Sequence, residues 1–144
     1  MSIEHTESQR QVSDPFSYLY SAEFIRLTTY RKNVVAVPTA VWFANDDGKL
    51  YVTTTSTAGK IKRIRNSSRV LVAPCDRTGQ VLAGKESEAQ AHELPVDAHE
   101  HAYATLAKKY GPQFEVIASR APATAQRTYF VIEPLIGAIE HGNQ

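Results

Sequence analysis

Three β-rich runs, separated only by short turn sequences, constrain the fold of this chain more than any other feature. They are FIRLTTY (24–30), VVAVPTAVWFA (34–44) and KLYVTTT (49–55), and they are rich in Val, Thr and aromatic residues, which favour strands. The connections at Lys32-Asn33 and at 45–48 (NDDG) contain residues that tolerate left-handed turn conformations. We therefore expect an antiparallel meander of three strands here.

The rest of the chain predicts three further strands and two to three short helices. Strands are expected at 69–76, 80–94 and 128–139, where β-branched residues or alternating patterns recur. A short helix is expected after a cap at Ser13 or Asp14, a second over KIKRIRN (60–66), and a third from an N-cap at Asp97 to a stop at Gly111-Pro112. This order predicts a mainly β, α+β domain with about six antiparallel strands in a barrel.

Length and composition set the class of protein. At 144 residues the chain is expected to form a single domain over 14–144, preceded by a flexible N-terminal arm over 1–13. Sixteen basic against fifteen acidic residues argue against a surface built for nucleic acid, and no apolar run reaches the length of a membrane span. The single cysteine, Cys75, and the polar N-terminal sequence indicate a cytoplasmic protein.

A basic segment is the sharpest electrostatic feature of the sequence. Five cations fall within ten residues, directly after the hydroxyl-rich strand end Thr53–Ser56: Lys60, Lys62, Arg63, Arg65 and Arg69. Hydroxyls, the amides of a helix N-terminus and Lys60 together suit a phosphate group. Two alternatives stay open, a solvated basic helix face without a ligand and contact with a nucleic-acid backbone. Neither GxxxxGK[ST] nor GxGxxG occurs.

The sequence contains no recognisable constellation for acid–base, nucleophilic or metal chemistry. His99 and His101 are two apart on an expected helix and cannot share a metal, so no metal site is predicted. Cys75 ends a strand without a local His partner, which is typical of a small buried side chain. Trp42 is either a core residue or the wall of a site for a planar ligand. Catalytic residues stay unknown, so an enzyme here would need a cofactor to supply the chemistry.

Four blocks of the sequence resemble one known superfamily. TTYRKN (28–33), the segment 37–66, RVLVAPCDRTG (69–79) and YATLAKKYG (103–111) look like the pyridoxamine 5'-phosphate oxidase-like superfamily, and within it the branch of F420 (deazaflavin)-dependent enzymes. The resemblance covers about Tyr18 to Ile139. It implies an FMN-binding split β-barrel that forms a homodimer with cofactor sites at the interface.

The resemblance also implies which residues hold the cofactor. The phosphate would lie at Thr53, Thr54, Ser56, Lys60 and Arg63, the ring along Thr39, Ala40, Val41 and Trp42, and the edge of the cleft at Pro74 and Cys75. Two positions depart from the family pattern, because Ala40 replaces a usual proline and Val34 a usual glycine. Arg31 and Lys32 would assist a cofactor tail or substrate, or simply lie on the hairpin surface.

The expected function is a flavin- or deazaflavin-dependent oxidoreductase. Its cofactor would be F420, with FMN as the alternative, and it would transfer a hydride to or from a small organic substrate whose identity and direction of reaction the sequence does not specify. Two other hypotheses stay open: a cofactor-binding or sequestering protein without turnover, and a small barrel that binds nucleic acid through its basic helix.

Overall fold

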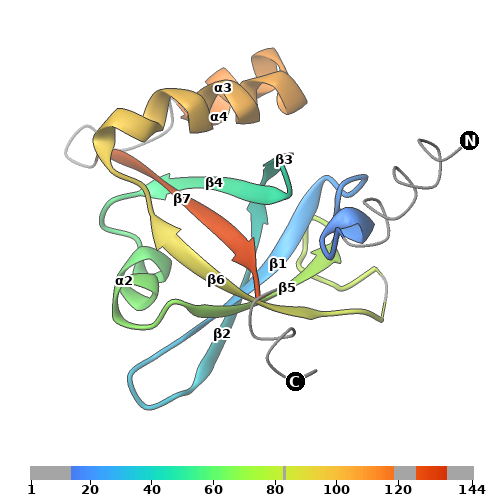
Figure 1. The fold of residues 1–144 in the computed structure, drawn as a ribbon, viewed down its shortest axis with the longest axis vertical. Coiled ribbons are helices and arrows are strands. Elements are labelled where there is room, and N and C mark those ends of the chain that lie inside the picture. Colours follow the sequence, from blue (N-terminus) through green and yellow to red (C-terminus); the bar gives the residue numbers. More distant parts are fainter. Residues whose placement is uncertain (1–13, 83, 119–125, 136–144) are drawn as a thin grey trace, which may run out of the picture.

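The computed structural model describes residues 14–82, 84–118 and 126–135, whose strands form one antiparallel sheet that curls into a split barrel (Figure 1). The seven strands follow the order β2-β1-β5-β6-β7-β4-β3. They are β1 (Phe24–Tyr30), β2 (Ala36–Trp42), β3 (Ala44–Asp46), β4 (Lys49–Thr55), β5 (Arg69–Cys75), β6 (Ser87–Glu93) and β7 (Arg127–Pro134). The expected mainly β, α+β class is confirmed.

Short helices cover the ends and one side of this sheet. They are η1 (Ser17–Leu19), α2 (Gly59–Asn66), η2 (Val96–Ala98), α3 (His99–Tyr110) and α4 (Pro112–Ala118). In Figure 1, α3 and α4 lie across one end of the sheet, over β3, β4 and β7, while α2 lies beside β6 and β1. Within the described ranges, no helix has the length and apolar character needed to cross a membrane.

The strand pairing corrects the expected three-stranded meander. β1 and β2 do form a hairpin, in the register Phe24↔Trp42 to Tyr30↔Ala36. β4, however, pairs with β3 and β7 rather than with β2. Turn residues indicate where a chain reverses but not which strand becomes the neighbour, and a break at Phe43 separates β2 from β3. β2 is consequently an edge strand.

Several element boundaries also differ from those expected. The strand predicted over 80–94 begins only at Ser87, because the Asp76 carboxylate accepts the N–H groups of Thr78 and Gln80 and holds a turn there. Asp97 lies in η2, and α3 starts at His99 with no side-chain cap. The expected arm over 1–13, with Ser13, and the chain beyond residue 135 lie outside the described residues.

Two clusters of buried side chains stabilise the barrel. The larger fills the curl of the sheet and includes Leu27, Phe43, Phe130 and the two isoleucines of α2, Ile61 and Ile64. The smaller holds α3 and α4 on β3, β4 and β7: Ala44, Ala102, Leu106, Phe114 and Tyr129. Burial of these apolar surfaces is the main force that keeps the helices on the sheet.

The hydroxyl of Tyr110 closes α3 onto the break between β2 and β3. It accepts the N–H of Phe43 at 2.9 Å, and its single proton is shared between the carbonyl oxygens of Phe43 at 2.6 Å and Glu23 at 2.7 Å. The neighbouring Lys109 donates to the carbonyl oxygen of Ala22 at 2.8 Å, and burial lowers the pKa of this lysine to about 8. These contacts join the end of α3 to the start of β1 and the end of β2.

We predict that Tyr110→Phe lowers the free energy of unfolding by about 1–3 kcal/mol, because it leaves the Phe43 N–H buried without an acceptor. Urea denaturation measures the change. Tyr103→Phe is the matched control on the same helix, since its ring packs edge-on against Phe114 and its hydroxyl makes no hydrogen bond to any of the described residues. Equal losses for the two variants would contradict the role of the Tyr110 hydroxyl.

Candidate cofactor phosphate site

The N-terminus of α2 is an uncapped helix end directly after β4. The turn before it is held by the N–H of Ser56, which donates to the carbonyl oxygen of Gln126 at 2.7 Å, and by the N–H of Ala58, which donates to that of Thr55 at 3.1 Å. Ala58 is the N-cap residue and offers no side-chain hydrogen bond, and the first turn contains no acidic residue. The partial positive charge of this helix end is therefore not compensated locally.

The cations of the basic segment fall into two groups. Arg65 is paired with Glu93, with 2.7 Å between Nε and Oε1, and Arg69 is paired with Glu88. Lys60, Lys62 and Arg63 form no ion pair in the described part of the chain. On a simple solvated basic face we would expect no such difference in ion pairing among the five cations. Here the cations without an ion pair among the described residues gather toward the N-terminal part of α2.

Lys60 is half-buried beside two further cations. Burial lowers the pKa of its ammonium group, and the nearby positive charges of Arg63 and Arg127 lower that pKa further. Among the described residues, no carboxylate raises the pKa of Lys60 in compensation. A half-buried ammonium group among like charges is unfavourable unless an anion joins it, so this position is suited to a phosphate.

Arg63 folds back over the first turn of α2. Its Nε donates to the Oγ1 of Thr29 on β1 at 2.6 Å. Its Nη1 lies so close to Gly59 that a Cβ added there would be only 2.9 Å away. The guanidinium thus lies at the uncapped helix end, held by a buried hydroxyl and by the space that a glycine leaves.

Arg127, on β7, is a site residue that the sequence did not reveal. The antiparallel register places it opposite Thr55, at the end of β4, and its Nη1 lies 3.5 Å from the Oγ1 of Thr53. Burial lowers the pKa of its guanidinium. The sequence does show an arginine directly before the last β-rich run, but only the pairing of β7 with β4 reveals that it lies beside the end of β4.

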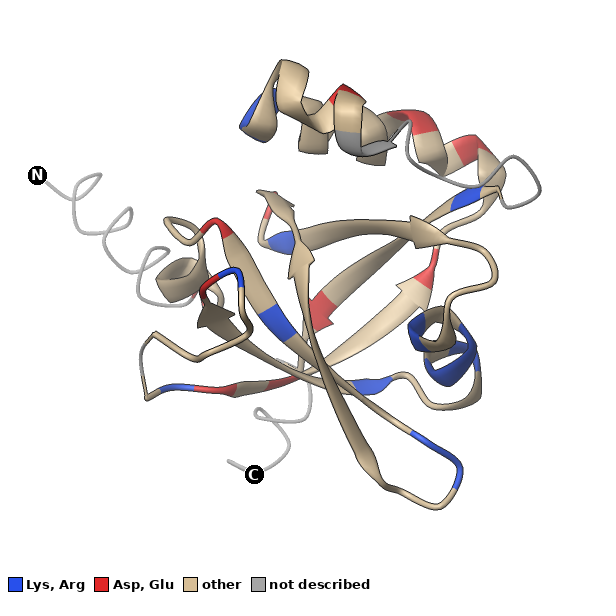
Figure 2. Cartoon of the chain, turned by 180° about the vertical axis from the view of Figure 1, so that it is seen from behind, with Lys and Arg blue, Asp and Glu red and all other residues tan. Residues whose placement is uncertain are grey.

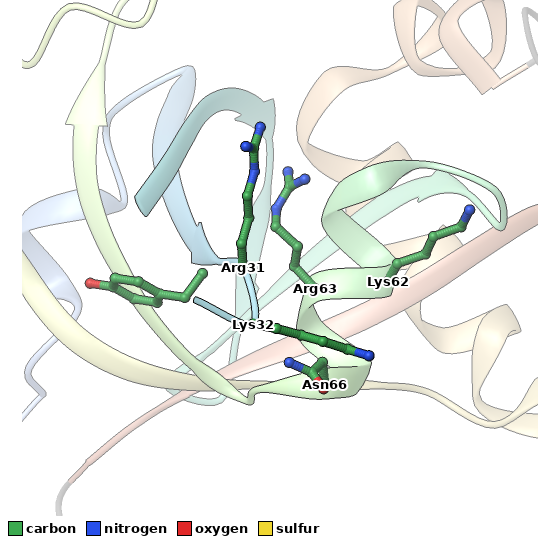
Figure 3. Close-up of a pocket in the computed structure, with 6 residues that line it drawn as sticks. Arg31, Lys32, Lys62, Arg63 and Asn66 are labelled. Atoms are coloured by element: carbon green, nitrogen blue, oxygen red, sulfur yellow. The ribbon is translucent and has the colours of Figure 1, made fainter. Parts of the chain in front are cut away.

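A basic cavity of about 230 Å³ continues from Arg63 toward the β1–β2 hairpin. It is lined by Tyr30, Arg31, Lys32, Lys62, Arg63 and Asn66, so four cations and no acidic residue line it. Figure 3 shows the guanidinium groups of Arg31 and Arg63 side by side. In Figure 2 the Lys and Arg residues of α2 and of the hairpin tip lie on the same side of the molecule.

The structure brings only part of the expected phosphate set to this site. Thr53, Ser56, Lys60 and Arg63 lie around the end of β4 and the start of α2, with Thr53 donating its Oγ1 proton to the carbonyl oxygen of Thr128 at 3.0 Å. Thr54 alternates with Thr53 along the strand and is 7% exposed. Its side chain belongs to the packed interior of the barrel.

The expected ring and cleft residues lie elsewhere on the sheet. Thr39 and Ala40 line a second cavity of about 450 Å³, whereas Val41 is buried in the main core. Trp42 packs against Tyr110, with 4.3 Å between ring centroids. Pro74 and Cys75 pair with β1, which separates them from β2; both are buried, and burial raises the pKa of the Cys75 thiol.

Comparison with known proteins identifies the architecture. No family model and no curated protein matches the chain. Among solved structures, an F420 reductase is 24% identical with a TM-score of 0.55, and the match covers 83% of this chain and 91% of that one. HutZ, the heme storage protein from Vibrio cholerae, is 12% identical with a TM-score of 0.63, over 88% and 89% of the two chains.

A third solved structure, from Listeria innocua, is provisionally assigned as a pyridoxamine 5'-phosphate oxidase. It is 15% identical, with a TM-score of 0.58 over 88% of this chain and 91% of that one. The chain folds as a split β-barrel. The resemblance to the pyridoxamine 5'-phosphate oxidase-like superfamily is thereby confirmed at the level of the fold. On this split barrel the α2 site lies where β4 ends and α2 begins.

We predict that Thr29→Val weakens binding of inorganic phosphate at α2 about tenfold, because Arg63 loses the hydroxyl that holds it, equivalent to about 1.4 kcal/mol. Phosphate titration followed by the NMR shifts of the Gly59 and Lys60 amides measures the affinity. Thr28→Val is the control, since Thr28 is also buried on β1 but its hydroxyl makes no hydrogen bond to Arg63. An unchanged affinity in Thr29→Val would remove Thr29 from the site.

Proposed function

We propose that this split barrel is an F420-dependent oxidoreductase that holds the cofactor phosphate at the N-terminus of α2. The observation that carries the proposal is Lys60, a half-buried cation with Arg63 and Arg127 beside it and, among the described residues, no carboxylate in contact. The solved F420 reductase with the same fold supports the choice of cofactor class. In this protein the phosphate would neutralise Lys60 and Arg63 and accept hydrogen bonds from the helix amides.

The cofactor would supply the hydride chemistry, and the protein would bind and orient it. Along β2, Thr39 and Ala40 would lie against the ring, while Trp42 would close the end of the strand through its contact with Tyr110. The described residues include no acid–base pair beside this strand. The reaction we propose is therefore hydride transfer to or from a small organic substrate.

The basic cavity beside Arg63 favours F420 over FMN. FMN ends in a single phosphate, whereas F420 continues beyond its phosphate into an acidic tail. Arg31, Lys32 and Lys62 extend the positive surface beyond the phosphate site, where FMN would have no group to bind. FMN in the same site is the second candidate, because the Lys60 cluster alone suits either cofactor.

A second copy of the chain would complete the site in our proposal. β2 pairs on one side with β1 and on its other side with no strand among the described residues. The neighbouring hairpin tip exposes Val34 and Val35, with 80% and 46% of their surfaces accessible. Cytoplasmic location and homodimer formation are parts of the same proposal, and sedimentation tests the latter.

The decisive experiment is titration of the purified protein with F420 and with FMN, followed by cofactor fluorescence. We expect Lys60→Ala to weaken F420 binding about tenfold to a hundredfold, the range expected for loss of one charge-assisted hydrogen bond of about 1.5–3 kcal/mol. Lys108→Ala is the matched control, because Lys108 is an exposed lysine on α3. Tight F420 binding by Lys60→Ala would sink the phosphate assignment.

The same titration separates the remaining functions. Binding of neither cofactor would exclude the oxidoreductase, and salt-sensitive binding of an oligonucleotide instead would favour the nucleic-acid barrel. Cofactor binding without reduction of any acceptor would favour a sequestering protein. Binding of heme in place of a flavin would point to the role of HutZ, the heme storage protein.

Cofactor affinity should also depend on pH through Lys60. The pKa of this lysine is lowered in the free protein, so its ammonium group loses the proton at a lower pH than an ordinary lysine does. Affinity for the phosphate therefore falls as the pH rises through this lowered pKa. Lys60→Arg keeps its charge and should show no such fall. Identical profiles for the two proteins between pH 7 and about 10.4, the ordinary lysine pKa, would contradict the assignment.

A further inference from the structure

We propose that the second cavity, between β1–β2 and the loop after β5, binds the carboxylate of a small organic substrate. This inference rests on the proposed function and names the class of substrate. The cavity measures about 450 Å³ and is lined by Arg26 on β1, by Pro38, Thr39 and Ala40 on β2, and by residues 77–79. A volume of this size accommodates a small ligand.

Arg26 is an incompletely satisfied cation in the wall of this cavity. Its Nη2 pairs with the Oε2 of Glu86 at 3.2 Å, which uses one of its five N–H donors. Its Nε is buried and has no hydrogen-bond partner in the described structure. This Nε has almost no accessible surface, so a carboxylate in the cavity would pair with the Nη donors of the guanidinium that Glu86 leaves free.

Arg77 provides a second cation on the opposite wall. It is exposed at the tip of the turn after β5, and no ion pair of Arg77 is found in the described residues. The Oδ1 of Asp76, its neighbour in sequence, already accepts the N–H groups of Thr78 and Gln80 and the hydroxyl of Thr78. No carboxylate belongs to the lining of the cavity. The cavity therefore presents two arginines to its contents, one of which, Arg26, is paired with Glu86 outside the lining.

The remaining lining indicates the rest of the ligand. Pro38 and Ala40 form a small, mainly apolar wall on the exposed face of β2, and Gly79, with φ of 92°, turns the loop toward it. Arginine side chains pair with carboxylates in a planar, two-point geometry, so a flat acid with an apolar body fits this arrangement. Thr39 and Ala40 also belong to the strand proposed to carry the cofactor ring, so the acid and the cofactor would bind to the same edge strand.

The two basic cavities differ in what they can hold. The cavity beside α2 has four cations and continues from the phosphate site, so it suits the cofactor. The Arg26–Arg77 cavity is larger, and Glu86 compensates part of its charge, so it suits a single carboxylate more than a phosphate. The β1–β2 hairpin contributes to both, which places substrate and cofactor on one structural unit.

The test uses benzoate as the probe and benzamide as its uncharged counterpart, each titrated into the full-length protein and followed by amide NMR shifts. We expect saturable shifts at Ala40, Thr78 and Gly79 with benzoate, and at least tenfold weaker binding of benzamide. Arg77→Gln and Arg26→Gln should each weaken benzoate binding about tenfold or more. Lys108→Gln, the exposed control on α3, should leave it unchanged.

Several results would overturn the inference. They are absence of saturable benzoate shifts, equal binding of benzamide, and shifts confined to the α2 amides. Arg26 lies on a core strand, so the decisive variant is Arg77→Gln on the exposed turn. Loss of self-association in Arg77→Gln without a change in benzoate affinity would assign Arg77 to a contact with a second copy of the chain instead.

Cofactor titration of Arg77→Gln separates this inference from the proposed function. Unchanged F420 affinity with lost benzoate affinity supports both. F420 binding without benzoate binding in the wild-type protein removes only the carboxylate site, whereas benzoate binding without any cofactor binding removes the oxidoreductase and leaves the acid-binding cavity.

Discussion

Burial of two isoleucines in α2 determines where the charge of this protein lies. Ile61 and Ile64 are 0% and 3% exposed in the main core, so one face of an eight-residue helix is held against the sheet. Every other position of that helix must then face outward or along the sheet surface, and most of these positions are basic. The hydrophobic effect thus provides the energy that holds these like charges together. Their mutual repulsion opposes this arrangement.

The distribution of acidic residues turns this basic helix into a site. Glu93 and Glu88 neutralise the cations at the C-terminal side of the segment, and no acid reaches its N-terminal side in the described structure. Burial lowers the pKa of Lys60, and the charges of Arg63 and Arg127 lower it further. A helix end without a cap adds its own partial charge. The anion site that we propose would thus be a property of the assembled surface rather than of any single residue.

The edge position of β2 links this site to the second cavity. The strand is held by β1 on one side and by Tyr110 at its end, so its surface and its free edge remain available for a ligand or a partner. Its hairpin partner β1 provides Thr29 to the α2 site and Arg26 to the cavity on the opposite face of the sheet. Alternation of side chains along one strand would therefore serve both of the binding sites that we propose.

Much of the architecture was determined by local sequence. The β-rich runs predicted β1, the hairpin with β2, and β4 because strand propensity and turn chemistry act over a few residues. The basic segment and the preceding hydroxyls predicted Lys60, Arg63, Thr53 and Ser56 as one site, and the structure places all four around the end of β4 and the start of α2, within eleven positions of one another. The resemblance of longer blocks added the split barrel, which no local pattern specifies.

The tertiary structure decided which strands become neighbours, and with them the rest of the site. β4 pairs with β7 rather than β2, which brings Arg127 to Thr53 and Thr55 across more than seventy positions of sequence. Burial of Thr54 and Val41 follows from the side of the sheet that faces the core, which depends on the curl of the whole sheet. Pairing of strands so far apart in sequence depends on the collective burial of one core. The cations of α2 could therefore be predicted from the sequence, whereas the residues that β1 and β7 add to the proposed site could not.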